Sequence, residues 1–157
     1  MTDNEIINKA LTLGFVKAAI IDVDKLVCVP EYRKYCEENL CGNYDKLPAC
    51  PPQCGTVEEL NAKIQGYQKA LVLQTELLPI KKEMSEYVEG KRKHNQLTDA
   101  LLAELDLCNP LIMSAGPWKQ YSCMSAYAID AEKMAAACDM ICWGNDGKIR
   151  FFSSILF

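Results

Sequence analysis

The sequence lacks several features that identify common functional classes. No apolar run approaches the roughly 18 residues that a membrane-spanning helix needs. The motifs of phosphate loops, dinucleotide-binding turns and serine hydrolases are also absent. His94 is the only histidine, so a cysteine–histidine pair for nucleophilic catalysis would have to use that residue, and we do not expect one.

Positive charge is scarce relative to negative charge. The chain has 17 lysines and arginines against 21 acidic residues, which gives a formal net charge of −4. A surface of this sign repels phosphate backbones, so we expect no nucleic acid as a partner. Because no apolar span is present, we expect no membrane as a partner either.

The rest of the composition is that of a globular protein. Half of the 157 residues are hydrophobic and 24% are charged, a balance that excludes wholesale disorder. A chain of this length can bury roughly 70% of its unfolded surface. It contains no repeat, low-complexity tract or linker, and we therefore predict a single domain over residues 1–157.

One reactive residue type is abundant. The nine cysteines are Cys28, Cys36, Cys41, Cys50, Cys54, Cys108, Cys123, Cys138 and Cys142. Their number is odd, and residues 1–13 lack the basic and apolar segments of a signal peptide. We therefore expect a reducing, cytoplasmic location, where clustered cysteines bind metal or do redox chemistry more often than they form structural disulfides.

Local signals predict helices that alternate with strands. Thr2 with Glu5, and Thr56 with Glu59, have the spacing of a capping box at a helix N-terminus. The predicted helices cover residues 3–13, the segment between Thr56 and Gly66, 82–106 and 131–139. The predicted strands cover residues 15–23, 26–29, 67–75 and 111–113.

The last part of the chain predicts a C-terminal β-hairpin. Asn145-Asp146-Gly147 is a strong turn signal, and it lies between the apolar segments 141–143 and 149–157. Together with the alternating elements, this favours an α/β fold that has a mixed sheet of about 4–5 strands with helices packed on it. An α+β arrangement is the alternative.

Four of the cysteines lie in one segment, residues 31–55, which we call the cysteine loop. These four loop cysteines are Cys36, Cys41, Cys50 and Cys54, with the spacing Cys-x4-Cys-x8-Cys-x3-Cys. The segment is too polar and too often broken by proline and glycine to fold by its own packing. Four thiolates at such short separations can surround a zinc ion or hold the irons of a [4Fe-4S] cluster, so we predict that they bind a metal that organises the loop.

Cys54 also indicates a different chemistry. It stands two residues before Thr56, and the positive end of the helix predicted there should favour a thiolate. A thiol-redox protein could use such a residue as its nucleophile, with another cysteine as the resolving partner.

The remaining cysteines fit a role in packing. A free cysteine often behaves as a small buried hydrophobe, and we expect this of Cys28, Cys138 and Cys142. Cys108 gives no functional indication. His94 follows the basic residues 91–93, and such a run usually lies on a solvated helix face.

The cysteine loop resembles the opening motif of a known family. The matching residues are Cys36-x4-Cys41-Gly42-Asn43-Tyr44, Cys50-Pro51-Pro52 and Gly55-Thr56-Val57-Glu58-Glu59. Residues 89–95, 124–130 and 151–157 resemble later segments of the same family, in the same order. The family is that of predicted metal-binding proteins, domain of unknown function 2284.

The resemblance implies a cysteine-ligated centre in a small cytoplasmic prokaryotic protein, and it favours an iron–sulfur cluster over zinc. It carries ligands over to Cys36, Cys41 and Cys50. Leu60 stands near the place of a further family cysteine, so Cys54 is the candidate replacement. The family's second cysteine run is shortened to residues 116–123, with Cys123 alone left, which implies one centre at most.

The leading interpretation is therefore a metal-binding protein with one cysteine-ligated centre, used for electron transfer, redox sensing or bracing of the loop. A thiol-redox protein that uses Cys54 and a degenerate, non-catalytic interaction module are the alternatives. The residues themselves assign no enzymatic reaction. A redox partner protein and a homodimer are the partners that fit. Protein exposed to air is a preparation in which the metal can be absent, because thiolates oxidise once they are uncoordinated.

Overall fold

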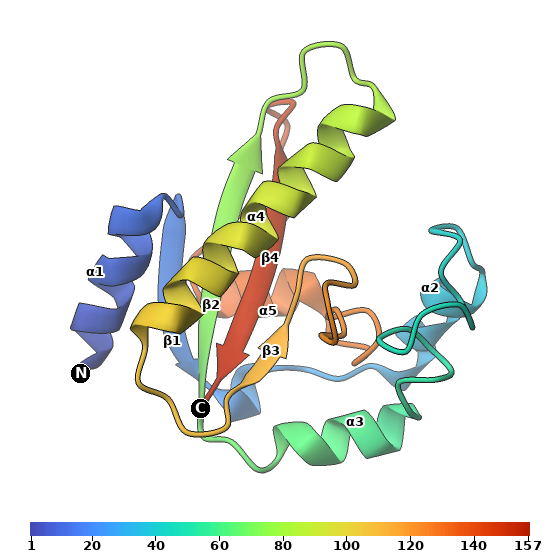
Figure 1. The fold of residues 1–157 in the computed structure, drawn as a ribbon, viewed down its shortest axis with the longest axis horizontal. Coiled ribbons are helices and arrows are strands. Elements are labelled where there is room, and N and C mark those ends of the chain that lie inside the picture. The colour runs from blue at the N-terminus through green and yellow to red at the C-terminus, as the bar shows by residue number, and fades with distance from the viewer.

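The computed structural model describes residues 1–157 and contains one four-stranded sheet with helices on both faces (Figure 1). The strands are β1 (Lys17–Asp22), β2 (Lys69–Leu77), β3 (Leu111–Met113) and β4 (Ile149–Leu156). The helices are α1 (Asp3–Leu13), α2 (Lys34–Glu37), α3 (Val57–Ile64), α4 (Met84–Glu104) and α5 (Ala131–Ala137), with 3₁₀ turns at Val23–Lys25 and Pro30–Arg33. None of the helices combines the length and the apolar character that a membrane span requires.

The sheet has the order β1-β2-β4-β3, and every pairing in it is antiparallel. The predicted class, an α/β fold of four strands with packed helices, is confirmed, and the α+β alternative fits it as well. The strand directions differ from the expected mixed sheet. β2 and β3, which α4 connects, run parallel to each other, but β4 lies between them and runs antiparallel to both, so no two neighbouring strands are parallel.

The predicted C-terminal hairpin is wrong. Residues 141–143 form no strand, and β4 pairs with β2 along one edge and with β3 along the other. β4 pairs with β2 without interruption along its whole length. The first pair is Ile149 with Leu77 and the last is Leu156 with Ala70. Pairing with this long buried strand stabilises β4 more than pairing with a three-residue segment whose Trp143 is 76% exposed.

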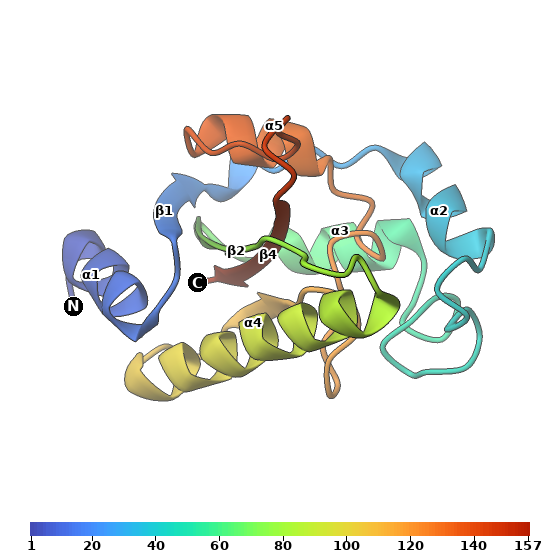
Figure 2. The same cartoon turned by 90° about the horizontal axis from the view of Figure 1, so that it is seen from above.

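Alternation along β2 divides the core into two clusters. Leu71 and Leu73 pack with α1 and α4 on one face, whereas Ala70 and Val72 pack with α3 and α5 on the other. Successive strand residues point to opposite faces, so a strand buried on both sides reads as a continuous apolar run. Figure 2 shows the resulting layers, with the sheet between α4 and α5.

The two predicted capping boxes are confirmed. The side-chain oxygen of Thr2 accepts from the N–H of Glu5 (3.2 Å), and that of Thr56 accepts from the N–H of Glu59 (3.1 Å). The side chain of Asp130 accepts from the N–H of Lys133 (3.0 Å) and caps α5, so the helix predicted over residues 131–139 begins where expected.

The cysteine loop lies at the end of the molecule away from α1 (Figures 1 and 2). It begins in the 3₁₀ turn and α2 and ends at the cap of α3. The segment that follows β3 lies beside it in both views. The sheet and α3 therefore fix the two ends of the loop, while its middle stands clear of the two core clusters.

Candidate metal centre

The interior of the cysteine loop is held by hydrogen bonds rather than by apolar packing. The N–H of Asp45 donates to the carbonyl of Pro51 (2.7 Å), and the N–H of Tyr44 donates to the Asn39 side chain (3.0 Å). Ala49 and Cys50 are its buried hydrophobic residues. The prediction that this segment has little packing of its own is thus confirmed.

The four loop cysteines differ in their exposure. Cys50 is buried at 7% exposure, Cys36 and Cys54 are half-buried, and Cys41 is exposed. All nine cysteines of the chain are free thiols. The four reduced sulfur atoms of the loop thus range from exposed, at Cys41, to buried, at Cys50.

The thiols of the loop lie in one electrostatic neighbourhood. Burial, and after it the charges of neighbouring thiols, Cys41 and Cys50 among them, together raise the pKa of Cys36 to about 11. Burial likewise raises the pKa of Cys50 to about 11, with Cys41 and Cys54 contributing. Thiolates this close destabilise one another, and a bound cation would remove that repulsion.

The donor set fits a thiophilic metal, but the side chains do not form a ready-made cage. The structure holds no group of three or more His, Cys, Asp or Glu side chains that could bind a metal ion as they stand. Thiolate sulfur is the donor that zinc and iron–sulfur clusters prefer. Metal binding is coupled to the folding of the segment that supplies the ligands, so a metal bound here would draw the loop cysteines together.

Cys54 lies next to a cation but does not gain the expected thiolate character. The Nη2 of Arg33 stands 3.7 Å from its Sγ. Burial nevertheless raises the pKa of Cys54, and this outweighs the lowering by Arg33. The expectation that the N-terminus of α3 favours a thiolate here is therefore wrong, because desolvation dominates and the capping box already occupies the helix end.

Sequence reasoning did not single out Arg33 or Cys123 as parts of this site. Arg33 also donates to the carbonyl oxygen of Gly55 (2.7 Å), at the junction of the loop and α3. Cys123 adds to the pKa increase of Cys36, Cys50 and Cys54, so its thiol belongs to the same neighbourhood. Nothing local in the sequence marks Arg33, whereas Cys123 was visible as the residue left from a shortened motif.

The cysteines expected in the core are there. Cys28, Cys138 and Cys142 are half-buried and pack against the cluster beneath α3 and α5. The thiol of Cys28 also donates to the carbonyl of Tyr127 (3.5 Å). Cys108 is exposed, away from the loop. These residues are useful as controls for thiol chemistry.

His94 does not occupy the solvated position that its basic neighbours predict. It is 1% exposed, and its ring nitrogens lie 2.6 Å from Thr75 Oγ1 and 2.9 Å from Ser153 Oγ. Each helix residue is rotated by about 100° from the last, so His94 points to the sheet although residues 91–93 face solvent. Burial lowers its pKa to about 4, which keeps the ring neutral and unsuited to proton transfer.

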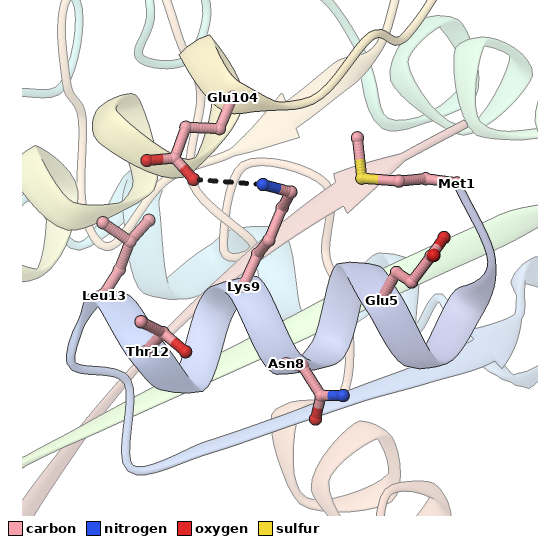
Figure 3. A pocket seen from close by; sticks show the side chains of 7 residues that line it. All are labelled: Met1, Glu5, Asn8, Lys9, Thr12, Leu13 and Glu104. Carbon is pink, nitrogen blue, oxygen red and sulfur yellow. Dashed lines mark ion pairs between the residues drawn. The ribbon is translucent and has the colours of Figure 1, made fainter.

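A hollow of about 480 Å³ lies elsewhere, along α1 and the end of α4. Figure 3 shows Lys9 reaching Glu104 across it (3.7 Å), while Asn8 points away from that ion pair. No cysteine lines this hollow. Its side chains do not converge on a common point, so it offers no chemistry that competes with the cysteine loop.

Comparison with known proteins adds one finding. The profile of a family described as predicted metal-binding protein, domain of unknown function 2284, matches residues 19–117. The matched span contains all four loop cysteines and ends before Cys123. No curated protein and no solved structure matches the chain.

Proposed function

Because that match covers more than half of its length, this chain belongs to the family of predicted metal-binding proteins, and we propose that it binds one metal centre through the thiolates of the cysteine loop. The candidate ligands are the four loop cysteines, Cys36, Cys41, Cys50 and Cys54, whose spacing fits a single centre. The observation that carries the proposal is a cluster of reduced thiols in a segment that has almost no apolar packing.

An iron–sulfur cluster is favoured over zinc as the occupant. A cluster supplies one-electron transfer when it is bound, whereas zinc would supply structural bracing alone. The protein's contribution is to bring the thiols together, to shield Cys50 from solvent and to place the Arg33 cation nearby. If the centre is an iron–sulfur cluster, the function that we propose for the protein is electron exchange with a redox partner protein.

Metal analysis of anaerobically prepared protein tests the proposal. We expect stoichiometric iron and sulfide, together with visible absorption that is lost when Cys36 or Cys50 is replaced by serine. The exposed Cys108 is the matched control, because C108S removes a thiol outside the loop and should retain the full metal content. Stoichiometric zinc without iron would exclude the redox role, and absence of both metals would exclude the proposed function.

Thiol-redox activity is the alternative, and the position of Arg33 beside Cys54 is the feature that favours it. The raised pKa of Cys54, caused mainly by burial, argues against it. The alkylation rate of Cys54 as a function of pH separates the two functions. A rate below that of a free model thiol at neutral pH is the result that we expect, and a faster rate would support the alternative.

A further inference from the structure

Four large apolar side chains are exposed together where β2 leads into α4. Leu78 follows β2, and Ile80 lies in the loop between β2 and α4. Met84 and Val88 belong to the first two turns of the helix. The four side chains are between 60% and 89% exposed, with Ile80 the most exposed of them. We call residues 78–88 the apolar tip, because the loop and the start of α4 project beyond the ends of β2 and β4 (Figure 1).

One carboxylate holds the loop of the apolar tip in shape. The oxygens of Glu86 accept hydrogen bonds from the N–H groups of Ile80 (2.6 Å) and Lys81 (2.8 Å). A third bond, from the N–H of Glu83 (3.2 Å), completes the capping box of α4. The protein therefore displays Ile80 in an organised loop, although an apolar side chain in water gains free energy when a partner covers it.

The charges on and beside the apolar tip are unbalanced. The three acidic residues of segment 78–93 already have partners within the chain, because Glu83 and Glu86 form the capping box and Glu89 binds Arg92. The free charge here is therefore positive, although the whole chain has a net charge of −4. A partner of complementary charge is anionic. The exposed lysines that form no ion pair are Lys81, Lys82, Lys91 and Lys93.

The shape of the apolar tip favours a lipid surface over a protein as this partner. Neither the hollow along α1 nor a second hollow around Tyr67 and Cys108 reaches the tip, so no groove there would receive a peptide. A projecting apolar loop needs a matching pocket in a protein partner, whereas the boundary between lipid head groups and acyl chains admits apolar side chains without such a pocket. Lysines beside the inserted side chains are attracted by anionic head groups.

We propose that the apolar tip docks the protein reversibly on anionic lipid bilayers. Ile80 and Leu78 insert at the level of the head groups, and the lysines of the tip contact the lipid phosphates. Peripheral contact of this kind needs no spanning helix. It revises the expectation that the chain has no membrane as a partner, which was drawn from the absence of an apolar span.

Sedimentation with sucrose-loaded vesicles tests the proposal in the unsubstituted protein. Vesicles of phosphatidylcholine alone are compared with vesicles in which about a third of the lipid is phosphatidylglycerol. Binding to the anionic vesicles should be tighter by about tenfold or more, because several lysines contribute, and it should weaken at high salt. Absence of binding to the anionic vesicles, or equal binding to the two kinds, would overturn the proposal.

Substitution of one apolar side chain tests which part of the protein inserts. Ile80→Ser should weaken binding to the anionic vesicles about tenfold, because the inserted apolar area is lost. Leu40→Ser is the control, since Leu40 is 85% exposed and lies outside the apolar tip, and it should bind as the wild type does. An equal loss in the two variants, or no loss in Ile80→Ser, would refute insertion of the tip.

A second pair of variants tests the charges. Lys81→Gln combined with Lys82→Gln should weaken binding about tenfold and reduce its salt dependence. Lys25→Gln combined with Lys63→Gln removes the same charge from two exposed lysines outside the tip and should have a smaller effect. Circular dichroism verifies that each variant folds, and the comparison of the two vesicle types in the wild type decides the case if one does not. Equal effects of the two pairs would show that net charge alone governs binding.

Sedimentation velocity without lipid distinguishes the bilayer from a second copy of the chain as the occupant of the tip. The association state should be the same in the wild type and in Ile80→Ser. A dimer that dissociates in Ile80→Ser would assign the tip to contacts between copies and overturn the proposal. None of these measurements requires a bound metal, so their outcome is independent of the metal-binding function.

Discussion

His94 is buried more deeply than any other ionisable side chain of the protein. Both of its ring nitrogens have hydroxyl partners, and Thr98 extends the chain of hydrogen bonds to Ser153 (2.8 Å). No buried side-chain nitrogen or oxygen in the structure lacks a partner. Such a fully satisfied polar network is stable while the ring stays neutral, and burial penalises the charge that a second ring proton would bring.

Stability should therefore fall on mild acidification because of His94. Its pKa is about 4 in the folded state against 6.5 for an ordinary histidine, so the unfolded chain binds a proton first as the pH drops. The contribution of the neutral His94 ring to the free energy of unfolding is complete above about pH 6.5, and it is lost as the pH falls towards 4. Between pH 7.5 and 5 the wild type should lose about 2 kcal/mol more unfolding free energy than His94→Gln.

Urea unfolding at the two pH values measures this difference. Carboxylates titrate in both proteins, so their effect cancels when the two losses are compared. Equal losses in the wild type and in His94→Gln would show that the histidine is not the source of the pH dependence.

Single residues of the site were predictable to the extent that their chemistry is local. The spacing of Cys36, Cys41 and Cys50 marks a metal loop regardless of the fold. Cys123 stands 69 positions after Cys54 in the numbering, and Arg33 acts through backbone carbonyls from two separate segments. Contacts between residues that are far apart in the sequence depend on tertiary packing, and a local sequence pattern does not predict them.

At the scale of elements, α4 crosses the sheet closely at Gly90. A Cβ atom at this position would stand 2.8 Å from Phe151 Cε2 and 3.2 Å from Leu77 Cδ2. Phe151 lies on β4 and Leu77 on β2. The absence of a side chain at Gly90 thus lets the helix contact two strands at once, although glycine weakens a helix interior.

Gly90→Ala should therefore destabilise the protein despite its better helix propensity. Alanine gains about 1 kcal/mol in a helix interior, but overpacking against an aromatic ring costs typically 1–3 kcal/mol, so we expect a net loss of about 1 kcal/mol. Gln96→Ala, at an exposed position of the same helix, is the control and should be neutral or slightly stabilising. Thermal unfolding of the two variants gives the answer, and a higher melting temperature for Gly90→Ala would contradict this account of the crossing.

Element prediction succeeded where the signal was short-range. The capping boxes at Thr2 and Thr56 each involve residues three positions apart, and both helices begin as expected. The hairpin prediction failed because the partner of β4 is chosen by long-range register. Asn145-Asp146-Gly147 does form a turn region, yet the strand that follows it pairs with residues 69–77 instead of with its local neighbour.

At the scale of the whole molecule, the sheet and its two core clusters are complete without the cysteine loop. The largest buried side chains come from the strands and from the helices that cover them, among them Leu71, Met134 and Leu101. Within the loop, the buried residues are Ala49, Cys50 and Pro51. Metal binding should therefore order a peripheral segment rather than create the fold.

Metal loading should raise thermal stability by a moderate amount. At a free concentration of about 100 times the dissociation constant, a ligand specific to the folded state contributes about 2.7 kcal/mol, which corresponds to about 5–10 °C for a protein of this size. Scanning calorimetry with and without the metal measures the shift. Limited proteolysis within residues 37–55 should slow in parallel, because the metal then holds the middle of the loop as well as its ends. Stoichiometric binding with an unchanged melting temperature would show that the metal does not brace the loop.

The position of β4 in the sheet also has a consequence for biosynthesis. β2 and β3 both leave the ribosome before β4, yet neither pairs with the other in the finished sheet. Until residues 149–156 are available, the nascent chain exposes the inner edges of both strands, and open edges invite pairing with other chains. Emerging polypeptides of this protein are therefore expected to depend on chaperones that shield strand edges until translation has passed β4.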